Sequence, residues 1–171
     1  MTPRPSWDSI WMSTADVVAQ RSRCTRRKIG AVIVDAHNRP IAMGYNGPPA
    51  NWKGDSGEDL YANGALVRHI SDGSDCREWC PRALKANVGA DYADCVTIHA
   101  EINALLFADR RDFSGGTIYV TSVCCWDCGK AIANSGLKRV VTRVNRGSDG
   151  HRLFQRTIDL LTDCGMEVSI V

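Results

Sequence analysis

The sequence predicts an α/β domain with a mostly parallel sheet that helices cover on both faces. Two observations lead to this prediction. After an initial hairpin pattern, helical apolar spacing and short apolar runs rich in β-branched residues alternate to the end of the chain. The chain has 171 residues with a 44% apolar fraction, which suits one domain with a sizeable hydrophobic core.

The first third of the chain is expected to form a helix and a β-hairpin. Apolar residues recur at helical spacing over residues 6–21, and neither Gly nor Pro interrupts them. Residues 31–34 (Ala-Val-Ile-Val) predict a buried strand. Residues 40–44 predict a second strand, which pairs with the first across the polar turn at residues 35–38.

Helix and strand patterns then alternate in the second half of the chain. The expected helices cover residues 100–109, 127–135 and 153–162, and the expected strands cover residues 117–121, 139–144 and 167–171. Gly136 follows the second of these helices and is expected to end it as a C′ glycine.

Residues 50–95 differ in composition from the rest. Gly, Asp, Asn and Ser are frequent there, and apolar periodicity is weak. A loop of this length in a compact domain needs something other than a hydrophobic core to fix it. We therefore expect a single domain over residues 1–171 with an insertion at about residues 50–95.

The charge balance and the cysteine count exclude several classes of protein. With 21 Lys+Arg against 19 Asp+Glu, the net charge of +2 disfavours polynucleotide or membrane-surface partners. The polar residues 1–8 do not suit a secretory leader, and no apolar run suits a spanning helix, so we expect a cytoplasmic protein. Eight cysteines in such a chain are then expected to be metal ligands or buried thiols.

The pattern with the clearest chemistry joins His99 and Glu101 to Cys125 and Cys128. Zinc binds imidazole and thiolate ligands in a tetrahedron, and three protein ligands leave the fourth position for a water. Glu101 lies two residues beyond His99, near enough to move a proton without binding the metal. The alternative is a purely structural zinc. The presence of Glu101 beside His99 disfavours this alternative, because a structural site does not need the acid.

Longer stretches around these residues resemble the deoxycytidylate (dCMP) deaminases of the cytidine deaminase-like zinc deaminase superfamily. The matching stretches are Arg-Ser-Arg-Cys at 21–24, Ile-Gly-Ala-Val-Ile-Val at 29–34, Gly-Tyr-Asn-Gly-Pro-Pro at 44–49, His-Ala-Glu-Ile-Asn-Ala at 99–104 and Ile-Tyr-Val-Thr-Ser at 118–122. The resemblance runs from about residue 6 to the C-terminus, with residues 50–95 the most divergent. It implies a three-layer α/β/α fold with a central mixed five-stranded sheet.

The resemblance also implies an activity, the zinc-dependent hydrolysis of dCMP to dUMP and ammonia, which supplies dUMP for thymidylate synthesis. Glu101 would take a proton from a zinc-activated water and deliver protons to the cytosine N3 and the leaving amine. Asn46 would contact the sugar, and Ala100 belongs to the substrate-binding residues. The alternative for Asn46 is a turn residue.

Five basic residues lie between Arg21 and Lys28, and the resemblance places this segment near the substrate phosphate. Arg26 and Arg27 are the candidates for binding it. The alternative is a solvated basic loop.

Some dCMP deaminases that this chain resembles carry a second zinc, which fixes their long insertion. A structural zinc held by four further cysteines would do the same here, with His69 as a substitute ligand. The four candidate ligands are Cys24, Cys76, Cys80 and Cys95. The alternative is that they are buried thiols.

The two remaining cysteines are expected to be ordinary thiols. Cys124 stands where the family motif Pro-Cys-x-x-Cys has proline, and we expect it to be buried or to be a reactive neighbour of the site. Cys164 is expected in the core.

The family is regulated by dCTP and dTTP. The resemblance assigns the binding of these nucleotides, together with Mg²⁺, to Gly44, Tyr45 and Gly47. It further implies a homo-oligomer, with a hexamer favoured, and a setting in the cytoplasm of the host if the protein is viral. Two other functions stay open. One is deamination of another nucleotide or base, such as a 5-modified dCMP or a guanine derivative. The other is a non-catalytic protein that binds zinc and a nucleotide.

Overall fold

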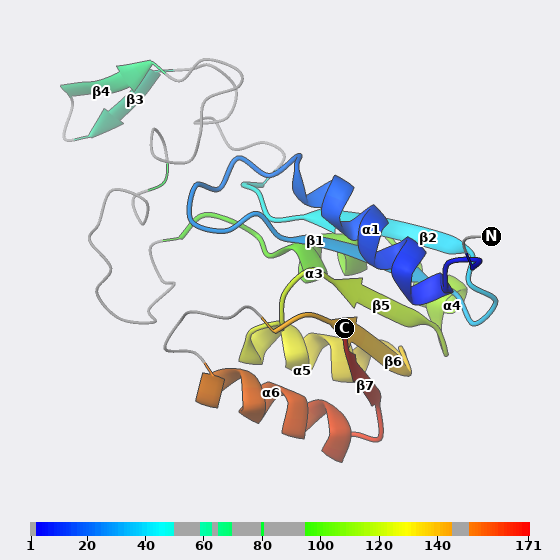
Figure 1. Ribbon diagram of the computed structural model, residues 1–171. Helices are drawn as coiled ribbons and strands as arrows, with labels where there is room; N and C mark the ends of the chain where they lie inside the picture. Colours follow the sequence, from blue (N-terminus) through cyan, green and yellow to red (C-terminus); the bar gives the residue numbers. More distant parts are fainter. Residues whose placement is uncertain (1–2, 50–58, 63–64, 70–79, 81–94, 145–150) are drawn as a thin grey trace.

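A five-stranded mixed sheet lies at the centre of the computed structural model (Figure 1). The structure describes residues 3–49, 59–62, 65–69, 80, 95–144 and 151–171. The strand order is β2-β1-β5-β6-β7. The strand bounds are β1 Gly30–Val34, β2 Pro40–Tyr45, β5 Thr117–Val120, β6 Arg139–Thr142 and β7 Glu167–Ile170.

The mixed sheet is confirmed, whereas the mostly parallel sheet that the alternating pattern predicted is wrong. β1 pairs antiparallel with both β2 and β5, and only the β5–β6 and β6–β7 pairings are parallel. The reason is the position of the hairpin. Its first strand joins the sheet beside β5, and its second strand, β2, becomes the edge of the sheet.

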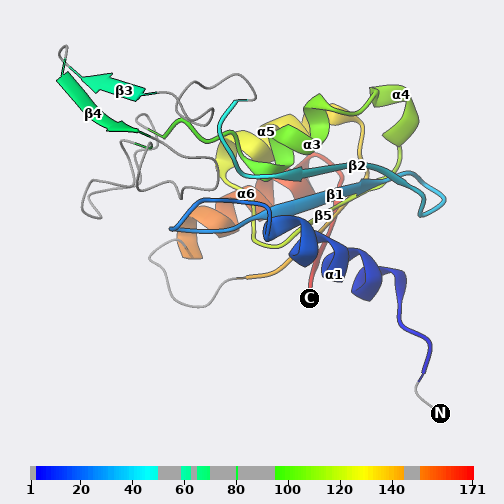
Figure 2. The ribbon, with the colours of Figure 1, turned by 90° about the horizontal axis from the view of Figure 1, so that it is seen from above.

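Helices cover both faces of this sheet, as predicted. Figures 1 and 2 show α1 on one face and α3, α5 and α6 on the other. The helix bounds are α1 Trp7–Ala19, α3 Ala100–Leu106, α4 Arg110–Phe113, α5 Trp126–Ser135 and α6 His151–Asp163. The single helix expected over residues 100–109 ends early, and α4 begins anew after Asp109, whose side chain caps it by accepting from Arg111 N. Gly136 ends α5 with a φ of 99°, as expected of a C′ glycine.

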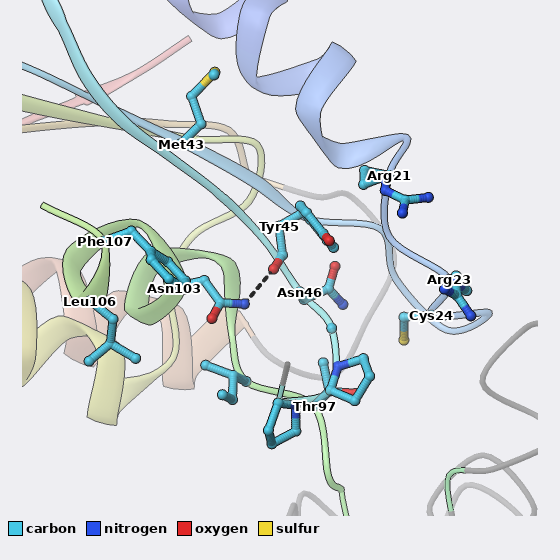
Figure 3. Close-up of a pocket in the computed structure, with 14 residues that line it drawn as sticks. Arg21, Arg23, Cys24, Met43, Tyr45, Asn46, Thr97, Asn103, Leu106 and Phe107 are labelled. Atoms are coloured by element: carbon cyan, nitrogen blue, oxygen red, sulfur yellow. Dashed lines mark hydrogen bonds between the residues drawn. The ribbon is translucent and has the colours of Figure 1, made fainter. Parts of the chain in front are cut away.

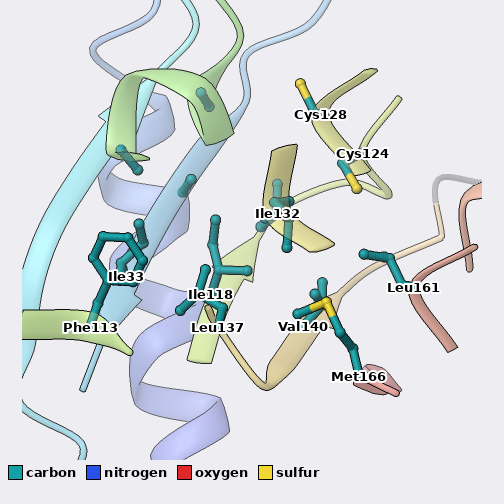
Figure 4. Close-up of a cluster of buried hydrophobic side chains, with 14 residues drawn as sticks. Ile33, Phe113, Ile118, Cys124, Cys128, Ile132, Leu137, Val140, Leu161 and Met166 are labelled. Carbon is teal, nitrogen blue, oxygen red and sulfur yellow. The ribbon is translucent and has the colours of Figure 1, made fainter. Parts of the chain in front are cut away.

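The alternation of β1 residues creates two hydrophobic clusters. Val32 and Val34 pack under α1 with Met12. Ala31 and Ile33 face the other side, where a larger cluster joins the sheet to α3, α5 and α6. Figure 4 shows this larger cluster, which includes Ile118, Ile132, Val140 and Leu161. Cys124 and Cys128 belong to it, so the hydrophobic core extends directly to the predicted metal ligands.

A separate two-stranded hairpin lies within residues 50–95, where the sequence analysis predicted no element. It consists of β3 (Asp59–Ala62) and β4 (Ala65–His69), which pair antiparallel. The Asn-Gly dipeptide at residues 63–64 is a typical hairpin turn sequence and could have indicated it. Among the helices that the structure describes, none is long and apolar enough to cross a membrane.

Charged hydrogen bonds fix the start of α1 to the sheet. Asp8 accepts two hydrogen bonds from the Arg139 guanidinium, at 2.7 and 2.8 Å, and a third from the Tyr119 hydroxyl at 2.9 Å. Arg139 also pairs with Glu167 on β7. The hydrogen bonds from Arg139 hold the pKa of Asp8 below its usual value of 3.8.

We expect Asp8→Asn to lower the free energy of unfolding by about 1–3 kcal/mol at pH 7, because charge-assisted hydrogen bonds are lost. A carboxyl with a lowered pKa stabilises the folded state above its unfolded pKa, and this stabilisation is lost as the pH falls through the folded value. The difference between the two proteins should therefore shrink below about pH 4. Urea unfolding of the two proteins at pH 7 and at pH 3 measures this difference in unfolding free energy. An equal difference at both pH values would contradict a stabilising role for the Asp8 carboxylate.

Candidate functional site

Two helix N-termini meet beyond the carboxyl end of β5. His99 is the N-cap residue of α3, and Cys125 is the N-cap residue of α5. The carboxyl ends of strands are where α/β folds place their sites. The partial positive charge of a helix N-terminus also favours a thiolate there.

The three predicted metal ligands lie together. His99 Nδ1 is 3.4 Å from Cys125 Sγ and 3.3 Å from Cys128 Sγ, and all three ligand atoms lie within 4.8 Å of one another. In a tetrahedral site with Zn–S bonds of about 2.3 Å and Zn–N bonds of about 2.0 Å, nitrogen and sulfur ligands are roughly 3.5 Å apart. The donor set and its spacing therefore fit zinc with three protein ligands.

Hydrogen bonding within this group prepares it for a cation. A hydrogen bond from Cys128, supported by one from His99, lowers the pKa of Cys125 to about 4. The same contact raises the pKa of Cys128, and the contact with Cys125 raises the pKa of His99 to about 9. The group thus stabilises a thiolate at neutral pH, and the thiolate is the form of cysteine that binds zinc.

Glu101 is buried in the first turn of α3, with 4% of its surface exposed. Desolvation raises the pKa of its carboxyl to about 7. A carboxyl that titrates near neutral pH can both take up and release a proton, as general acid–base catalysis requires. Buried acids with a shifted pKa beside a metal-ligand group are typical of catalytic sites.

The two remaining cysteines differ in environment. Cys124 is buried in the larger cluster, as expected, and burial raises the pKa of its thiol. Cys164 is exposed, so the expectation of a core thiol is wrong. It lies just beyond the end of α6, in a turn that Gly165 completes with a φ of 75°, and this turn faces solvent.

The basic segment before β1 is tied to the Gly-Tyr-Asn-Gly motif by Asn46. Its Nδ2 donates to the Arg27 carbonyl oxygen and its Oδ1 accepts from Ile29 N, both at 2.8 Å. The Arg27 guanidinium lies over the Phe154 ring of α6, 5.8 Å from its centroid, whereas Arg26 is exposed. These hydrogen bonds give Asn46 a structural role between two loops, and its contact with the sugar stays a prediction.

A cavity of about 400 Å³ lies between β2, α3 and the segment after α1 (Figure 3). Tyr45 and Gly47 line it, but Gly44 is not among its lining residues, and the effector site stays a prediction. Asn103 on α3 donates to the Tyr45 carbonyl oxygen at 2.8 Å. Arg21 and Arg23 of the predicted basic segment also line the cavity, whereas the sequence analysis missed Thr97, Leu106 and Phe107.

Gly44 instead allows α3 to approach β2. A Cβ atom at this position would lie 2.2 Å from the Ala100 carbonyl oxygen and 2.4 Å from Ala104 N. Since both neighbours are backbone atoms of α3, a side chain here would displace the helix that carries Glu101.

We expect Gly44→Ala to lower the free energy of unfolding by about 1–3 kcal/mol, as overpacking does. A Cβ atom at Gly47 would meet only the Tyr45 ring, at 3.3 Å, so Gly47→Ala is the matched control and should unfold nearly as the wild type does. Thermal unfolding of the two variants measures the difference. Equal stability would show that the approach of α3 does not require Gly44.

Only three of the four proposed ligands of a second zinc lie in the described part of the chain, so the structure does not test this site. Cys80 is buried, Cys24 and Cys95 are half-buried, and Cys76 lies outside the described residues, as does the side chain of His69. Within the described part of the chain, the group that could hold a metal is that of His99, Cys125 and Cys128. The second zinc therefore stays a prediction.

Two stacked pairs of aromatic and arginine side chains also escaped the sequence analysis. One is Arg27 over Phe154, and the other is Arg156 over Trp126, with the guanidinium carbon 4.6 Å from the ring centroid. Arg156 gave no signal, because an arginine on an amphipathic helix is ordinarily a solvated residue.

Residues 5–144 match the family described as the cytidine and deoxycytidylate deaminase zinc-binding region. The deoxycytidylate deaminase of Mycobacterium phage D29 is 40% identical over 144 residues, which are 81% of this chain and 94% of the phage protein. The deoxycytidylate deaminase of Schizosaccharomyces pombe is 35% identical over 168 residues, which cover 96% of this chain but 44% of the yeast protein. The crystal structure of the dCMP deaminase from cyanophage S-TIM5 in complex with dCMP and dUMP aligns with 99% of this chain at a TM-score of 0.62 and 26% identity.

The fold and the three-ligand group thus define a zinc-dependent hydrolytic deaminase. The chain belongs to the cytidine and deoxycytidylate deaminase family.

Proposed function

We propose that this chain hydrolyses dCMP to dUMP and ammonia. The observation that carries the proposal is the buried carboxyl of Glu101 beside the three zinc ligands, because a structural metal needs no acid of shifted pKa. The choice of dCMP rests on the relatives, which are named deoxycytidylate deaminases and match most of this chain. The S-TIM5 structure with dCMP and dUMP supports the same choice.

His99, Cys125 and Cys128 would hold the zinc ion. When bound, zinc supplies Lewis-acid chemistry that lowers the pKa of water and stabilises developing negative charge. Glu101 accepts the proton of the attacking water as its oxygen bonds to C4 of cytosine. It delivers this proton to N3, takes the second proton from the hydroxyl group that C4 now carries, and passes it to the exocyclic amine. The C4–N bond then breaks, the C4 carbonyl forms and ammonia leaves. A single carboxyl of near-neutral pKa can serve each of these transfers in turn.

The remaining substrate contacts are assigned to Asn46, Ala100, Arg26 and Arg27. Ala100 is the first residue of α3 and lies between His99 and Glu101, so its backbone lies beside the reacting groups. Asn46 can bind the sugar while it holds the loop, because its Oδ1 can accept and its Nδ2 can donate a second hydrogen bond. By holding the Arg27 backbone, it also links sugar recognition to phosphate recognition.

Release of ammonia from dCMP, a 5-modified dCMP, dCTP, deoxycytidine and dGMP tests the proposal on the zinc-loaded chain. Turnover of dCMP alone is the expected result. Turnover of dGMP, or of a 5-modified dCMP in preference to dCMP, would show that the substrate is that compound and not dCMP. No turnover with any of them, despite bound zinc, would favour the non-catalytic binding protein.

Two further parts of the proposal concern metals and regulation. A second zinc at Cys24, Cys76, Cys80 and Cys95 predicts two zinc ions per chain by elemental analysis, and a single zinc ion would refute it. For regulation, the cavity beside Tyr45 suits a nucleotide with Mg²⁺, since it offers Arg21 for phosphates and the buried Thr97 hydroxyl, which has no hydrogen-bond partner among the described residues. Activation by dCTP and inhibition by dTTP are expected, and Arg21→Gln should weaken both responses.

The chain is also proposed to form a homo-oligomer, with a hexamer favoured. Large apolar side chains gather in the exposed region around the cavity, namely Met43, Tyr45, Leu106 and Phe107. An exposed patch of this kind is typical of an interaction surface. Sedimentation of the wild type and of Phe107→Glu would measure the assembly, and a monomeric wild type would refute it.

A further inference from the structure

The first observation behind this inference is the pairing of Arg156 with Trp126. Trp126 is the first residue of α5 and follows Cys125 directly, and 38% of its surface is exposed. Arg156 projects from α6, and its guanidinium carbon lies 4.6 Å from the indole centroid. The pair therefore places a cation against the side chain of the residue that directly follows a predicted zinc ligand.

The second observation is that the basic segment before β1 reaches the same end of α6. Arg27 lies over Phe154, two residues before Arg156. The first turns of α6 therefore contact both the basic segment, through Phe154, and the first residue of α5, through Arg156. Figure 1 shows these three segments at the same end of the sheet.

The third observation is that Arg156 has its donors available. Within the part of the chain that the structure describes, no protein acceptor takes a hydrogen bond from its guanidinium, and no carboxylate pairs with it. Stacking on an indole occupies only the face of a guanidinium and leaves its N–H groups, which lie in the plane, free to bind two phosphate oxygens. The ring also reduces the freedom of the long side chain, so less entropy is lost on binding.

We propose that Arg156, positioned by Trp126, binds the phosphate of the nucleotide substrate and makes the enzyme prefer a monophosphate to a nucleoside. This inference rests on the proposed deamination of dCMP. It adds α6 to the basic segment as a second source of phosphate contacts. Trp126 is a positioning residue here, because it acts through the orientation of the Arg156 guanidinium.

Calorimetric titration of the zinc-loaded full chain with dUMP and with deoxyuridine tests the proposal. The two ligands differ only in the phosphate, and neither is consumed. Arg156→Gln is expected to weaken dUMP binding about 10- to 100-fold, as for a lost charge-assisted hydrogen bond, and to leave deoxyuridine binding unchanged. Arg156→Lys should recover part of the loss, and Trp126→Ala should weaken dUMP binding less than Arg156→Gln does.

Arg111→Gln is the matched control, since Arg111 is also exposed but lies on α4 and pairs with Asp109. Unchanged dUMP binding by Arg156→Gln, or an equal loss for both ligands, would overturn the proposal, and the second result would indicate a packing role between α5 and α6. Failure of the proposed function would instead be seen in the wild type, as absent dCMP turnover and absent dUMP binding, and this inference would fail with it.

Discussion

Replacing Glu101 with Gln is expected to lower kcat for dCMP deamination about 10²- to 10⁴-fold, the contribution typical of a general acid–base group. Gln has nearly the same size and polarity but cannot accept a proton. Since Glu101 is not one of the three ligands that lie together, the zinc content should stay at the wild-type value. Ammonia release and elemental analysis on the same sample measure the two quantities.

The control for this experiment is Asp112→Asn, which removes an exposed carboxylate on α4 and should leave kcat unchanged. Far-UV circular dichroism of Glu101→Gln should match that of the wild type. Full activity of Glu101→Gln would refute the proposed proton transfer. Loss of zinc together with activity would instead assign Glu101 to the metal.

The central part of the site could be predicted from the sequence because its ligands lie at fixed distances from the ends of regular elements. His99 and Cys125 are N-cap residues, and Cys128 lies one turn into α5, so predicting a strand–helix junction was enough to bring them together. For Cys124 the sequence left burial and a reactive neighbour open, and the structure shows it buried. Local spacing thus determines the arrangement of the ligands once the helices begin at the right residues.

The residues that were missed are those that meet through tertiary packing between distant segments. Arg156 and Trp126 lie thirty positions apart, on two amphipathic helices whose relative rotation no local pattern specifies. Gly44 was assigned to a nucleotide site from its motif, yet its neighbours are the backbone atoms of α3. The order of strands in the sheet has the same origin, because a hairpin pattern does not tell which of its strands will join the rest of the sheet.

Cysteine 128 is expected to be indispensable for zinc binding, whereas its neighbour at position 124 is not. Cys128→Ser should lower the zinc content by one ion per chain and reduce dCMP turnover by at least about 10³-fold, because the Lewis acid is lost. A zinc chelator should destabilise the wild type and have a smaller effect on this variant. The reason is that the binding free energy of the catalytic zinc no longer contributes to the folding of the variant. Elemental analysis and thermal unfolding with and without the chelator measure these changes.

Cys124→Ala is the matched control, because both thiols are buried in the same cluster of the core. Its loss of volume should cost about 1–2 kcal/mol of unfolding free energy, while zinc content and the response to the chelator should stay at wild-type values. The opposite outcome, with zinc lost from Cys124→Ala and kept by Cys128→Ser, would shift the ligand register by one cysteine. The remaining zinc content of Cys128→Ser also bears on the insertion, since one ion per chain means a second site and none means that the catalytic site was the only one.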